Sequence, residues 1–525
     1  MLRALRNLAR LARIALTLAR YDALFPLDRL GFTAPFGRAL RLVANLPGLR
    51  RDLGDLRPGE RLAAALIELG PSFIKFGQSL ATRADLIGDD IAEDLSRLQD
   101  RLAPFPSADA RAIVASELEC PLEDAFASFE DSPVAAASIA QVHLAVTTDG
   151  APVAVKVLRP GIEAKFDQDL DLFAWIAEQV ERNRPDLRRL KPREVIRTFA
   201  RVVAAEMDLR LEAAAASELA DNFAGDPSFR VPAIDWQRTA RRVLTLERIE
   251  GIPIDERARL VAAGIDPDAV LQTASRAFFL QVFRDGFFHA DLHPGNLFVA
   301  ADGALQVVDF GIMGRLDMAT RRYLGEMLLG FLESDYGRVA DVHFRAGYVP
   351  ANQSRDLFMQ ACRSIGEPIL GLPLSRISIA RLLGQLFKVT ETFEMEAQPQ
   401  LLLLQKTMMV AEGVGRLLNP DVNMWELSRP LIEDWMRDNL GPEARLRSTA
   451  QDIWQGVERL PGFLANVERL AAIIAEKGHQ LHPDTIARLL DAEGAHHRAS
   501  RGTAPQWIIA ALLAAILLTL AFKTF

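Results

Sequence analysis

The apolar and polar positions follow different periods along the chain and divide it into helical and β-rich segments. Residues 52–130 have helical periodicity, with two amphipathic runs, ERLAAALIELG and DDIAEDLSRLQDRL, that end at Pro71 and Pro104. Residues 133–157 change to strand alternation in IAQVHLAV and VAVKVL, on either side of the turn TTDGAP, which predicts a β-hairpin. Residues 161–222 return to a helical pattern.

The second half of the chain is mainly helical. Two short β-rich pieces, FRVPAIDW and RRVLTLERI, lead to Gly251, and residues 256–480 then follow helical patterns with one exception. The exception is 296–310, NLFVAADGALQVVDF, which predicts two strands around an Asp-Gly turn. This order predicts a small mixed α/β lobe, a connector near 247–252 and a larger helical lobe.

The C-terminal end contains a long apolar run, since residues 507–522 (WIIAALLAAILLTLAF) are apolar except for Thr519. The window from Gly502 to Phe522 contains no charge, and at ~1.5 Å per residue it reaches roughly 30 Å, the thickness of a hydrocarbon core. Trp507 stands at one boundary, and basic residues flank the window: His496, His497, Arg498, Arg501 and Lys523. The pattern predicts a transmembrane helix over 503–523, with the body of the protein on the cytoplasmic side. A buried terminal helix is the alternative.

The N-terminal stretch MLRALRNLARLARIALTLAR contains no acid and spaces its arginines at helical steps. These arginines are Arg3, Arg6, Arg10, Arg13 and Arg20. A basic amphipathic helix of this kind is typical of a segment that lies in a bilayer interface. Two other interpretations stay open, a helix that docks on its own protein and a cleaved organelle transit peptide.

Composition narrows the class of protein. The chain of 525 residues has a mean hydropathy of +0.08 and a net charge of −8, which does not favour a nucleic-acid binder. Its two cysteines, Cys120 and Cys362, exclude a disulfide scaffold. Arginine outnumbers lysine 53 to 8. Residues 1–51 carry about +8, which leaves an acidic remainder.

The strongest chemical signal is HADLHPGN, followed thirteen residues later by DFG. The spacing matches the protein-kinase signature, in which an Asp precedes an Asn by five positions and D-F-G follows a strand hairpin. Mg²⁺ prefers carboxylate and amide oxygens, so Asn296 and Asp309 are predicted to hold the metal against the phosphates. Asp291 is predicted to accept a proton or to orient the acceptor. His289 is predicted to support the loop backbone.

Upstream, VAVK lies in a predicted strand and matches the kinase V-A-I-K pattern, so Lys156 is predicted to pair with α/β-phosphate oxygens. The run before it takes the place of a glycine-rich loop, but all three glycine positions are alanine. Each alanine adds a Cβ and disfavours a positive φ, so the nucleotide is expected to be held differently from that of an ordinary kinase. The predicted nucleotide-binding residues of this alanine-rich loop are Ala135, Ala136, Ala137, Ser138, Ile139, Ala140 and Val142.

Together these motifs resemble the UbiB/ADCK family of atypical protein-kinase-like proteins. Two further motifs agree with it. KFGQ, with Lys75 and Gln78, is similar to the family's K-x-G-Q, and EMD, with Glu206 and Asp208, is similar to its E-x-D. Glu212 stands where the family has the Glu that pairs with the nucleotide lysine.

The resemblance covers roughly residues 55–480 and implies a two-lobed, protein-kinase-like α+β fold that binds ATP and Mg²⁺. It implies that a helical N-terminal extension folds over the place of a peptide substrate. Lys75, Gln78, Glu206 and Asp208 would then approach the nucleotide pocket, and Lys75 would join Asp291 and Lys156 as a catalytic residue. Glu247 is expected to make a hinge contact to the adenine.

These boundaries give an expected domain order. It runs as a basic amphipathic membrane-associating region (1–50), a helical extension with K-x-G-Q (51–130), a kinase-like N-lobe (131–250), a kinase-like C-lobe (251–480), a linker (481–502) and a transmembrane helix (503–523).

The resemblance implies a membrane-bound ATPase or kinase required for ubiquinone biosynthesis, at the bacterial inner membrane with its catalytic body cytoplasmic. It would support 2-polyprenylphenol 6-hydroxylation without being the hydroxylase, since no flavin fingerprint or iron triad is found. The expected partners are ATP, membrane phospholipid, prenylphenol or quinone intermediates and other ubiquinone-biosynthesis proteins, with no nucleic acid.

Two departures from ordinary kinases argue against peptide phosphorylation in trans. Ala290 replaces the Arg of H-R-D, and no A-P-E follows Gly311 within fifty residues. Two alternatives remain, a phosphotransferase of the aminoglycoside or choline kinase type and a non-catalytic lipid-binding scaffold switched by nucleotide. The first class lacks K-F-G-Q and a terminal membrane helix.

Overall fold

The computed structural model describes residues 2–25, 54–81, 87–96, 98, 102–183, 192–369, 385, 388–390, 392–395, 398–422 and 424–440. The chain divides into two compact units, Met1–Gly441 and Pro442–Phe525. All of the second unit lies outside the described residues, and so does the predicted transmembrane segment 503–523. Within the described ranges, no helix combines the length and the apolarity needed to cross a bilayer.

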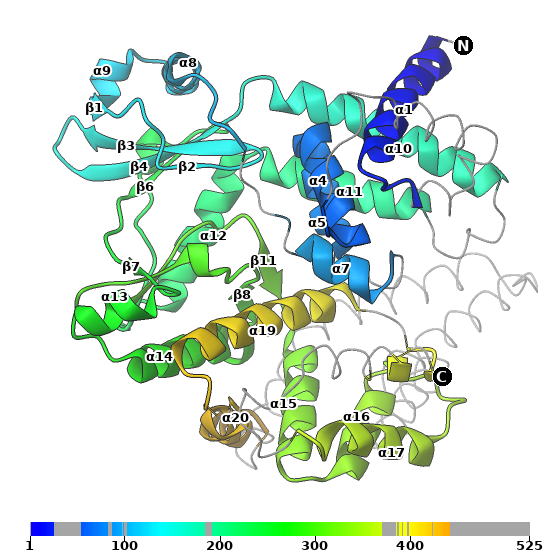
Figure 1. The fold of residues 1–525 in the computed structure, drawn as a ribbon. Helices are drawn as coiled ribbons and strands as arrows, with labels where there is room; N and C mark the ends of the chain where they lie inside the picture. Colours follow the sequence, from blue (N-terminus) through cyan, green and yellow to red (C-terminus); the bar gives the residue numbers. More distant parts are fainter. Residues whose placement is uncertain are drawn as a thin grey trace, which may run out of the picture. The chain divides into compact units, whose positions relative to one another are not determined.

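The N-terminal lobe is built on an antiparallel sheet of order β1-β3-β4-β6, with β2 paired to β3 (Figure 1). Its strands are β1 (Phe126–Phe129), β2 (Ala135–Ala136), β3 (Ala140–Thr147), β4 (Pro152–Leu158) and β6 (Val243–Glu247). Its helices are α8 (Ser107–Glu117), α9 (Leu122–Ala125), α10 (Ile162–Asn183), α11 (Pro192–Glu206), α12 (Leu209–Asn222) and the short η2 (Trp236–Arg238). The predicted hairpin over 133–157 is confirmed as β3 and β4.

The alternation along β4 decides which way its lysine faces. Val153, Val155 and Val157 are buried in one cluster with Ile113 of α8, so they face the same side of the sheet. Side chains of neighbouring strand residues point to opposite faces, which puts Lys156 on the other side. The side chain of Lys156 meets α12 there.

The C-terminal lobe combines helices with two small sheets, of order β5-β10-β9-β7 and β11-β8. Its strands are β5 (Phe229–Arg230), β7 (Ile252–Pro253), β8 (Phe287–His289), β9 (Leu297–Val299), β10 (Leu305–Val307) and β11 (Met313–Arg315). Its helices are α13 (Arg257–Ala262), α14 (Pro267–Phe279), α15 (Met318–Leu332), α16 (Tyr336–Arg345), α17 (Arg355–Gly366), α19 (Pro399–Leu418) and α20 (Met424–Leu440), with a π-helical turn η3 (Leu280–Asp285) and a 3-10 turn η4 (Pro294–Asn296).

The hairpin predicted over 296–310 is confirmed, because β9 and β10 pair antiparallel around Asp302-Gly303. Gly303 has a φ of +84°, as this tight turn requires. The prediction of helix over 52–130 was wrong at its end, where Phe126–Phe129 forms β1 and pairs with β3. The strands β8 and β11 were also missed. All three are only three or four residues long, too short to show a period.

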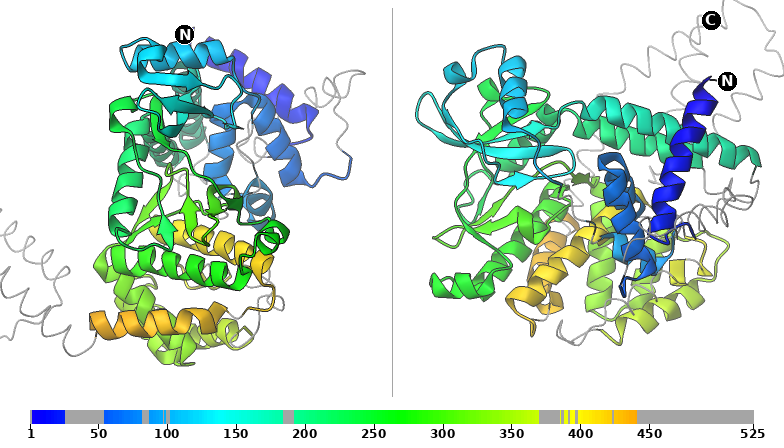
Figure 2. Two further views of the ribbon diagram at one scale, coloured as in Figure 1. Left: turned by 90° about the vertical axis from the view of Figure 1, so that its left-hand side faces the viewer. Right: turned by 45° about the horizontal axis from the view of Figure 1, so that its top comes forward.

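The extension before the N-terminal lobe contains α1 (Leu2–Arg20), α4 (Pro58–Leu69), α5 (Pro71–Ala81) and α7 (Asp89–Ser96). Helices α4, α5 and α7 pack on one another, and α5 also contacts α10 (Figure 2). Gly77 marks a close approach, because a Cβ there would lie 2.6 Å from Leu66 Cδ1. This contact gives the glycine of KFGQ a packing role.

The first helix docks on its own protein. Ala15 and Leu18 of α1 are buried in the core that α4, α5 and α10 share. Arg10 forms an ion pair with Asp169 of α10, and Arg20 pairs with Glu68 at 2.9 Å. The stretch 12–13 of the helix is exposed. Of the three interpretations of the N-terminal stretch, docking on its own protein therefore holds for the side of the helix that faces α4 and α10.

Candidate nucleotide-binding site

Three motifs that lie far apart in the sequence meet at Lys156. Its Nζ lies 2.7 and 3.0 Å from the two carboxylate oxygens of Glu212 and 2.8 Å from Oδ1 of Asp309. The side chains of Lys156 and Glu212 are only 14% and 8% exposed, whereas that of Asp309 is 50% exposed. The cluster thus has a buried end at Glu212 and an open end at Asp309.

Local backbone geometry positions the two acids. Glu212 lies in the first turn of α12, whose N-terminus is capped by Asp208, the acceptor for the backbone N–H of Arg210 at 3.2 Å. Asp309 has a φ of +65°, a left-handed conformation that is uncommon for residues other than glycine. Such strained residues concentrate at functional sites, and this one turns the D-F-G carboxylate toward β4.

The charges of the cluster perturb one another. Burial disfavours an ammonium, but the carboxylates of Asp309 and Glu212 outweigh it and raise the pKa of Lys156. The Lys156 ammonium holds the pKa of Asp309 well below its usual range, and Lys75 acts in the same direction. Burial raises the pKa of Glu212 to about 7, although Lys156 favours its charged form. The site therefore keeps a fixed cation beside an ionised, accessible carboxylate.

His289 holds the backbone of the predicted catalytic loop. Its Nδ1 accepts a hydrogen bond from the Asp291 N–H at 3.2 Å, so Nε2 carries the proton and donates to the Val308 carbonyl at 3.2 Å. Burial lowers the pKa of His289, which keeps the ring neutral in this tautomer. One imidazole thus ties the Asp291 segment to the residue that precedes Asp309.

A backbone hydrogen bond joins the chain segments that carry Asn296 and Asp309. The Val308 N–H donates to the Asn296 carbonyl at 3.0 Å, and the Asn296 amide Nδ2 donates to the Asp291 carbonyl at 3.0 Å. The amide oxygen of Asn296 is left as the acceptor end of that side chain. One amide oxygen and one half-exposed carboxylate fit Mg²⁺, which usually takes one or two protein ligands and completes its shell with phosphate and water.

The metal would therefore depend on the nucleotide. Among the described residues, no group of three or more His, Cys, Asp or Glu side chains is arranged to hold a metal by itself. Asn296 and Asp309 would supply the protein ligands, and the remaining positions would go to oxygens of the phosphates.

The alanine-rich loop is a closed turn between β2 and β3. The Ala137 N–H donates to the Ala140 carbonyl at 2.8 Å, and no residue of this fully described loop has a positive φ. Arg159 braces the turn, because its Nε and Nη2 donate to the Ala137 carbonyl at 3.0 and 2.8 Å. The backbone conformation of the loop is thus one that alanine adopts without strain, and the Arg159 guanidinium, just after β4, holds the turn closed. The other predicted loop residues behave as follows: Ala135 pairs with Val142, Ala136 pairs with Gln141, and Ser138 and Ile139 are buried.

Replacing Ala137 with glycine is expected to change the preference of the protein between ADP and ATP. The extra backbone freedom is worth about 0.5–1 kcal/mol, which corresponds to roughly two- to fivefold in the ratio of the two dissociation constants. Calorimetric titration of Mg-ADP and Mg-ATP measures that ratio. Ala151→Gly, at the far end of the same sheet, is the matched control. An unchanged ratio in Ala137→Gly would show that the loop does not shape the phosphate site.

The K-x-G-Q helix delivers Lys75 to the site. Phe73 and Phe76, on either side of Lys75 in α5, pack on Phe173 of α10 with ring centroids 5.2 and 4.8 Å apart. Lys75 Nζ lies 3.2 Å from Glu206 at the end of α11, and both side chains are largely buried. The predicted meeting of K-x-G-Q with E-x-D is seen in this ion pair.

The other residues of these two motifs have different contacts. Gln78 donates from Nε2 to the Leu98 carbonyl at 3.3 Å. Asp208 pairs with Arg210 at 2.6 Å and caps α12. Asp208 therefore acts on the site through the position of Glu212, which lies in the first turn of the helix that it caps.

Glu247 ends β6, where the sheet meets the connector. Its backbone N–H donates to the Ala233 carbonyl at 2.8 Å, and its Oε2 accepts from the Ala233 N–H at 3.2 Å. The carboxylate therefore fastens the connector to the preceding segment. The predicted hinge contact to adenine stays a prediction.

Two basic residues of the site were missed in the sequence. Arg159 braces the alanine-rich loop, as described above, and Lys406 of α19 lies 3.1 Å from Oδ1 of Asp291. Lys406 could have been noticed in the sequence because lysine is rare in this chain, with only eight in all.

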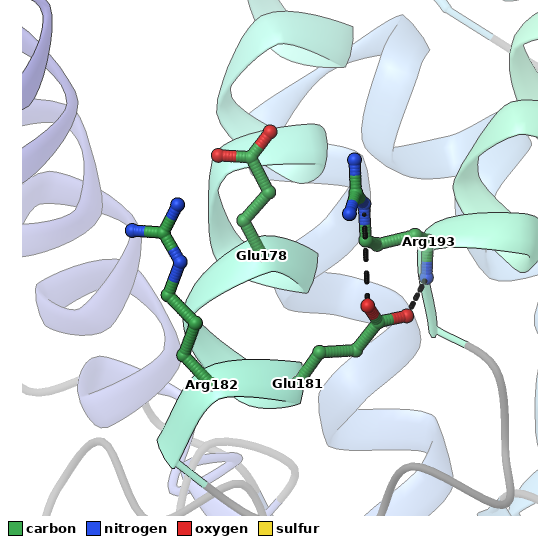
Figure 3. Close-up of a pocket in the computed structure, with 4 residues that line it drawn as sticks. All are labelled: Glu178, Glu181, Arg182 and Arg193. Atoms are coloured by element: carbon green, nitrogen blue, oxygen red, sulfur yellow. Dashed lines mark hydrogen bonds and ion pairs between the residues drawn. The ribbon is translucent and has the colours of Figure 1, made fainter.

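A separate polar hollow lies where α10 and α11 face each other, at the ends next to 184–191 (Figure 3). It is lined by Glu178, Glu181, Arg182 and Arg193. Glu181 accepts from the backbone N–H of Arg193 at 3.3 Å, and its other carboxylate oxygen lies 4.0 Å from the Arg193 guanidinium Nε, so two of the four charges already face each other. None of the motif residues lines this hollow.

Comparison with known proteins identifies the family. Residues 97–343 match the ABC1 atypical kinase-like domain, and residues 362–423 match the UbiB helical domain. The chain is 43% identical over 461 residues to the "Probable protein kinase UbiB" of Marinobacter nauticus, covering 87% of this chain and 83% of that protein. It is 42% identical over 482 residues to the protein of the same name from Xanthomonas axonopodis pv. citri, covering 90% and 85%.

A solved structure supports the same assignment. The complex of Rv3197 from Mycobacterium tuberculosis with erythromycin matches with a TM-score of 0.51 and 26% identity, covering 71% of this chain and 95% of that chain. The fold is therefore protein-kinase-like, with mixed helix and sheet. The motifs, the site that they build and these similarities agree, and the chain belongs to the UbiB family of ABC1 atypical kinase-like proteins.

Proposed function

We propose that this chain is a membrane-bound, Mg-ATP-dependent atypical kinase or ATPase that supports ubiquinone biosynthesis. It would assist the 2-polyprenylphenol 6-hydroxylation step without being the hydroxylase. The observation that carries the proposal is the convergence on Lys156 of Glu212 and Asp309, at 2.7 and 2.8 Å. Relatives named probable protein kinase UbiB, similar over most of the chain, support the link to ubiquinone.

Each residue of the site has a role in the proposed reaction. Lys156 binds phosphate oxygens and is held in place by Glu212. Asn296 and Asp309 would hold Mg²⁺, which neutralises charge on the phosphates when it is bound. Asp291 orients the acceptor and takes its proton as the acceptor oxygen bonds to the γ-phosphorus and the bond to the β–γ bridging oxygen breaks.

The acceptor is proposed to be water or a lipid-borne group rather than a peptide. Lys75 of α5 in the extension and Glu206 of α11 in the N-terminal lobe form a nearly buried pair, 12% and 9% exposed. The same helix α5 is fixed on α10 by aromatic packing. A rigid element that carries a lysine toward Asp309 leaves little room for an extended peptide.

The experiment that tests this proposal measures ATP hydrolysis by the purified full-length protein, with and without phospholipid vesicles and a prenylphenol. Quinone intermediates are profiled in parallel in a null strain that carries the wild-type or the Asp309→Asn gene. Stimulated hydrolysis and accumulation of the unhydroxylated prenylphenol with the variant are expected. A phosphorylated small molecule would favour the phosphotransferase alternative. Full rescue by Asp309→Asn would favour the scaffold.

Membrane attachment is proposed through the C-terminal segment 503–523, with the catalytic body on the cytoplasmic side of the bacterial inner membrane. Part of α1 is engaged by its own protein, with Ala15 and Leu18 buried, which leaves the C-terminal segment as the stronger anchor. Deletion of 503–525 is expected to move most of the protein to the soluble fraction after cell breakage. Deletion of 1–20 is the comparison, and release by that deletion alone would reverse the ranking of the two anchors.

A further inference from the structure

An ammonium group from the C-terminal helical segment lies at the predicted catalytic aspartate. Lys406 of α19 places Nζ 3.1 Å from Oδ1 of Asp291. Both side chains are about one-third exposed, at 34% and 33%, so the pair lies at the open edge of the site. Lys406 belongs to the part of the chain that matches the UbiB helical domain, outside the ABC1 kinase-like match.

The helix that carries Lys406 is fixed against the catalytic loop. Leu404 is buried in one cluster with Phe288 and Ala290, the second of which directly precedes Asp291. Thr407 is fully buried and donates from its hydroxyl to the Leu403 carbonyl at 2.9 Å. With the neighbours on either side held in place, Lys406 is directed at Asp291 by a rigid element.

Lys406 also shares its surroundings with the predicted metal site. His289 joins the Asp291 N–H on one ring nitrogen to the Val308 carbonyl on the other, at 3.2 Å each. Asp309 follows directly after Val308. The His289 imidazole thus lies between the segments of Asp291, which would face the acceptor, and Asp309, which would face the metal. The Lys406 ammonium lies beside Asp291.

The catalytic loop supplies no cation of its own to this end of the site. Ala290 occupies the position where the kinase signature has arginine. The His293 ring accepts the Gly295 N–H through Nδ1 at 3.0 Å, within the loop. Lys156 is held at the other end by Glu212, which is nearly buried. A side-chain cation beside Asp291 therefore has to come from outside the loop, and Lys406 supplies one.

We propose that Lys406 binds the terminal phosphate of ATP and stabilises the charge that develops there during transfer, while Asp291 holds the ammonium in place when no nucleotide is bound. The inference rests on the proposed function. An ammonium has three N–H donors, and Asp291 engages one, so contact with a phosphate oxygen does not require that ion pair to break. A cation aimed at the transferring group is a common source of transition-state stabilisation.

If Lys406 has this role, its removal should affect the binding of ATP and of ADP differently. Lys406 would contact only the terminal phosphate of ATP, so its removal should weaken ATP binding and leave ADP binding unchanged. A lysine that only fastens α19 to the catalytic loop would affect the two nucleotides equally.

The test uses the full-length protein in detergent with Mg-ATP and Mg-ADP. Lys406→Ala is expected to weaken ATP binding about tenfold and to lower kcat for hydrolysis about 100-fold, with ADP binding within about twofold of wild type. Lys406→Arg should restore part of kcat because it keeps the charge. Lys388→Ala removes an exposed lysine that lies before α19 and also falls in the part matching the UbiB helical domain, so it is the matched control.

Two results would overturn the inference while leaving the proposed function intact. One is wild-type ATP affinity and kcat in Lys406→Ala. The other is an equal loss of ATP and ADP binding in that variant, which would give Lys406 a structural role only. If the wild-type protein bound neither nucleotide, the proposed function would fail and this inference with it.

Discussion

Asp309→Asn is expected to abolish the stabilisation of the protein by Mg-ATP and to lower ATP hydrolysis at least about 100-fold. Asp309 is the accessible carboxylate of the site, 50% exposed, and it directly follows Val308, whose N–H donates to the Asn296 carbonyl. The variant keeps the size of the side chain but removes the negative charge that would hold Mg²⁺. The effect should be this large because no cluster of further acids among the described residues replaces the lost ligand.

Asparagine is chosen because it should leave the fold of the protein unchanged. Asp309 has a φ of +65°, and asparagine is among the few residues that adopt this conformation readily. The matched control is Asp302→Asn, on the turn of the β9–β10 hairpin, where the carboxylate is exposed and pairs with Arg230. Melting temperature with and without Mg-ATP is the measurement. An equal shift in wild type and Asp309→Asn would contradict the assignment of Asp309 to the metal.

Lys156→Met is expected to destabilise the protein by about 3–5 kcal/mol at pH 8 and by clearly less at pH 5.5. Removal of the ammonium leaves Glu212, which is 8% exposed, without its cation. The pKa of Glu212 is raised by burial to about 7 from an ordinary 4.5, so the folded protein holds this proton to a higher pH than the unfolded chain does. The stability contributed by the protonated acid is therefore complete below about 4.5 and is lost as the pH rises through 7.

In the variant, the penalty above pH 7 is larger because no ammonium offsets the buried carboxylate. Thermal unfolding at pH 5.5 and pH 8, with and without the second change Glu212→Gln, measures the effect. The double variant should recover most of the loss at pH 8, since it has no buried charge. A destabilisation that does not depend on pH, or that Glu212→Gln fails to relieve, would rule out the buried ion pair as its cause.

The sequence predicted the centre of the site because the chemistry there requires particular residue types at particular spacings. Lys156 and Asp309 are 153 positions apart, yet each was identified from a local motif, and the structure places them 2.8 Å apart. The β9–β10 hairpin was predicted for a related reason, since an Asp-Gly turn between two apolar runs is a strong local signal. The partner of Lys156, Glu212, came from the family resemblance and not from its own surroundings.

Long-range packing accounts for what the sequence did not predict. Lys406 reaches Asp291 across 115 positions, and nothing in the pattern of α19 distinguishes a lysine that faces the site from one that faces water. Arg159 follows a strand, and its sequence surroundings resemble those of many other arginines in this chain. Its hydrogen bond to the Ala137 carbonyl is seen only in the folded structure. Asp208 was expected at the nucleotide pocket with Lys75, but the structure gives it Arg210 and the cap of α12.

The N-terminal helix illustrates the same limit. Its arginine spacing suits a membrane surface, a docked helix or a transit peptide equally well, because all three need one basic face. The decisive residue is Asp169, which is 3% exposed on α10 and receives Arg10. A buried acid on another helix cannot be recognised from the pattern of the first.

Calorimetric titration of the full-length protein with ATP shows whether Lys156, Asp309 and Asn296 form a Mg-ATP site. One ATP is expected to bind per chain in the presence of Mg²⁺, with little binding when EDTA removes the metal. Absence of ATP binding with Mg²⁺ present, or binding of the same affinity in EDTA, would contradict it.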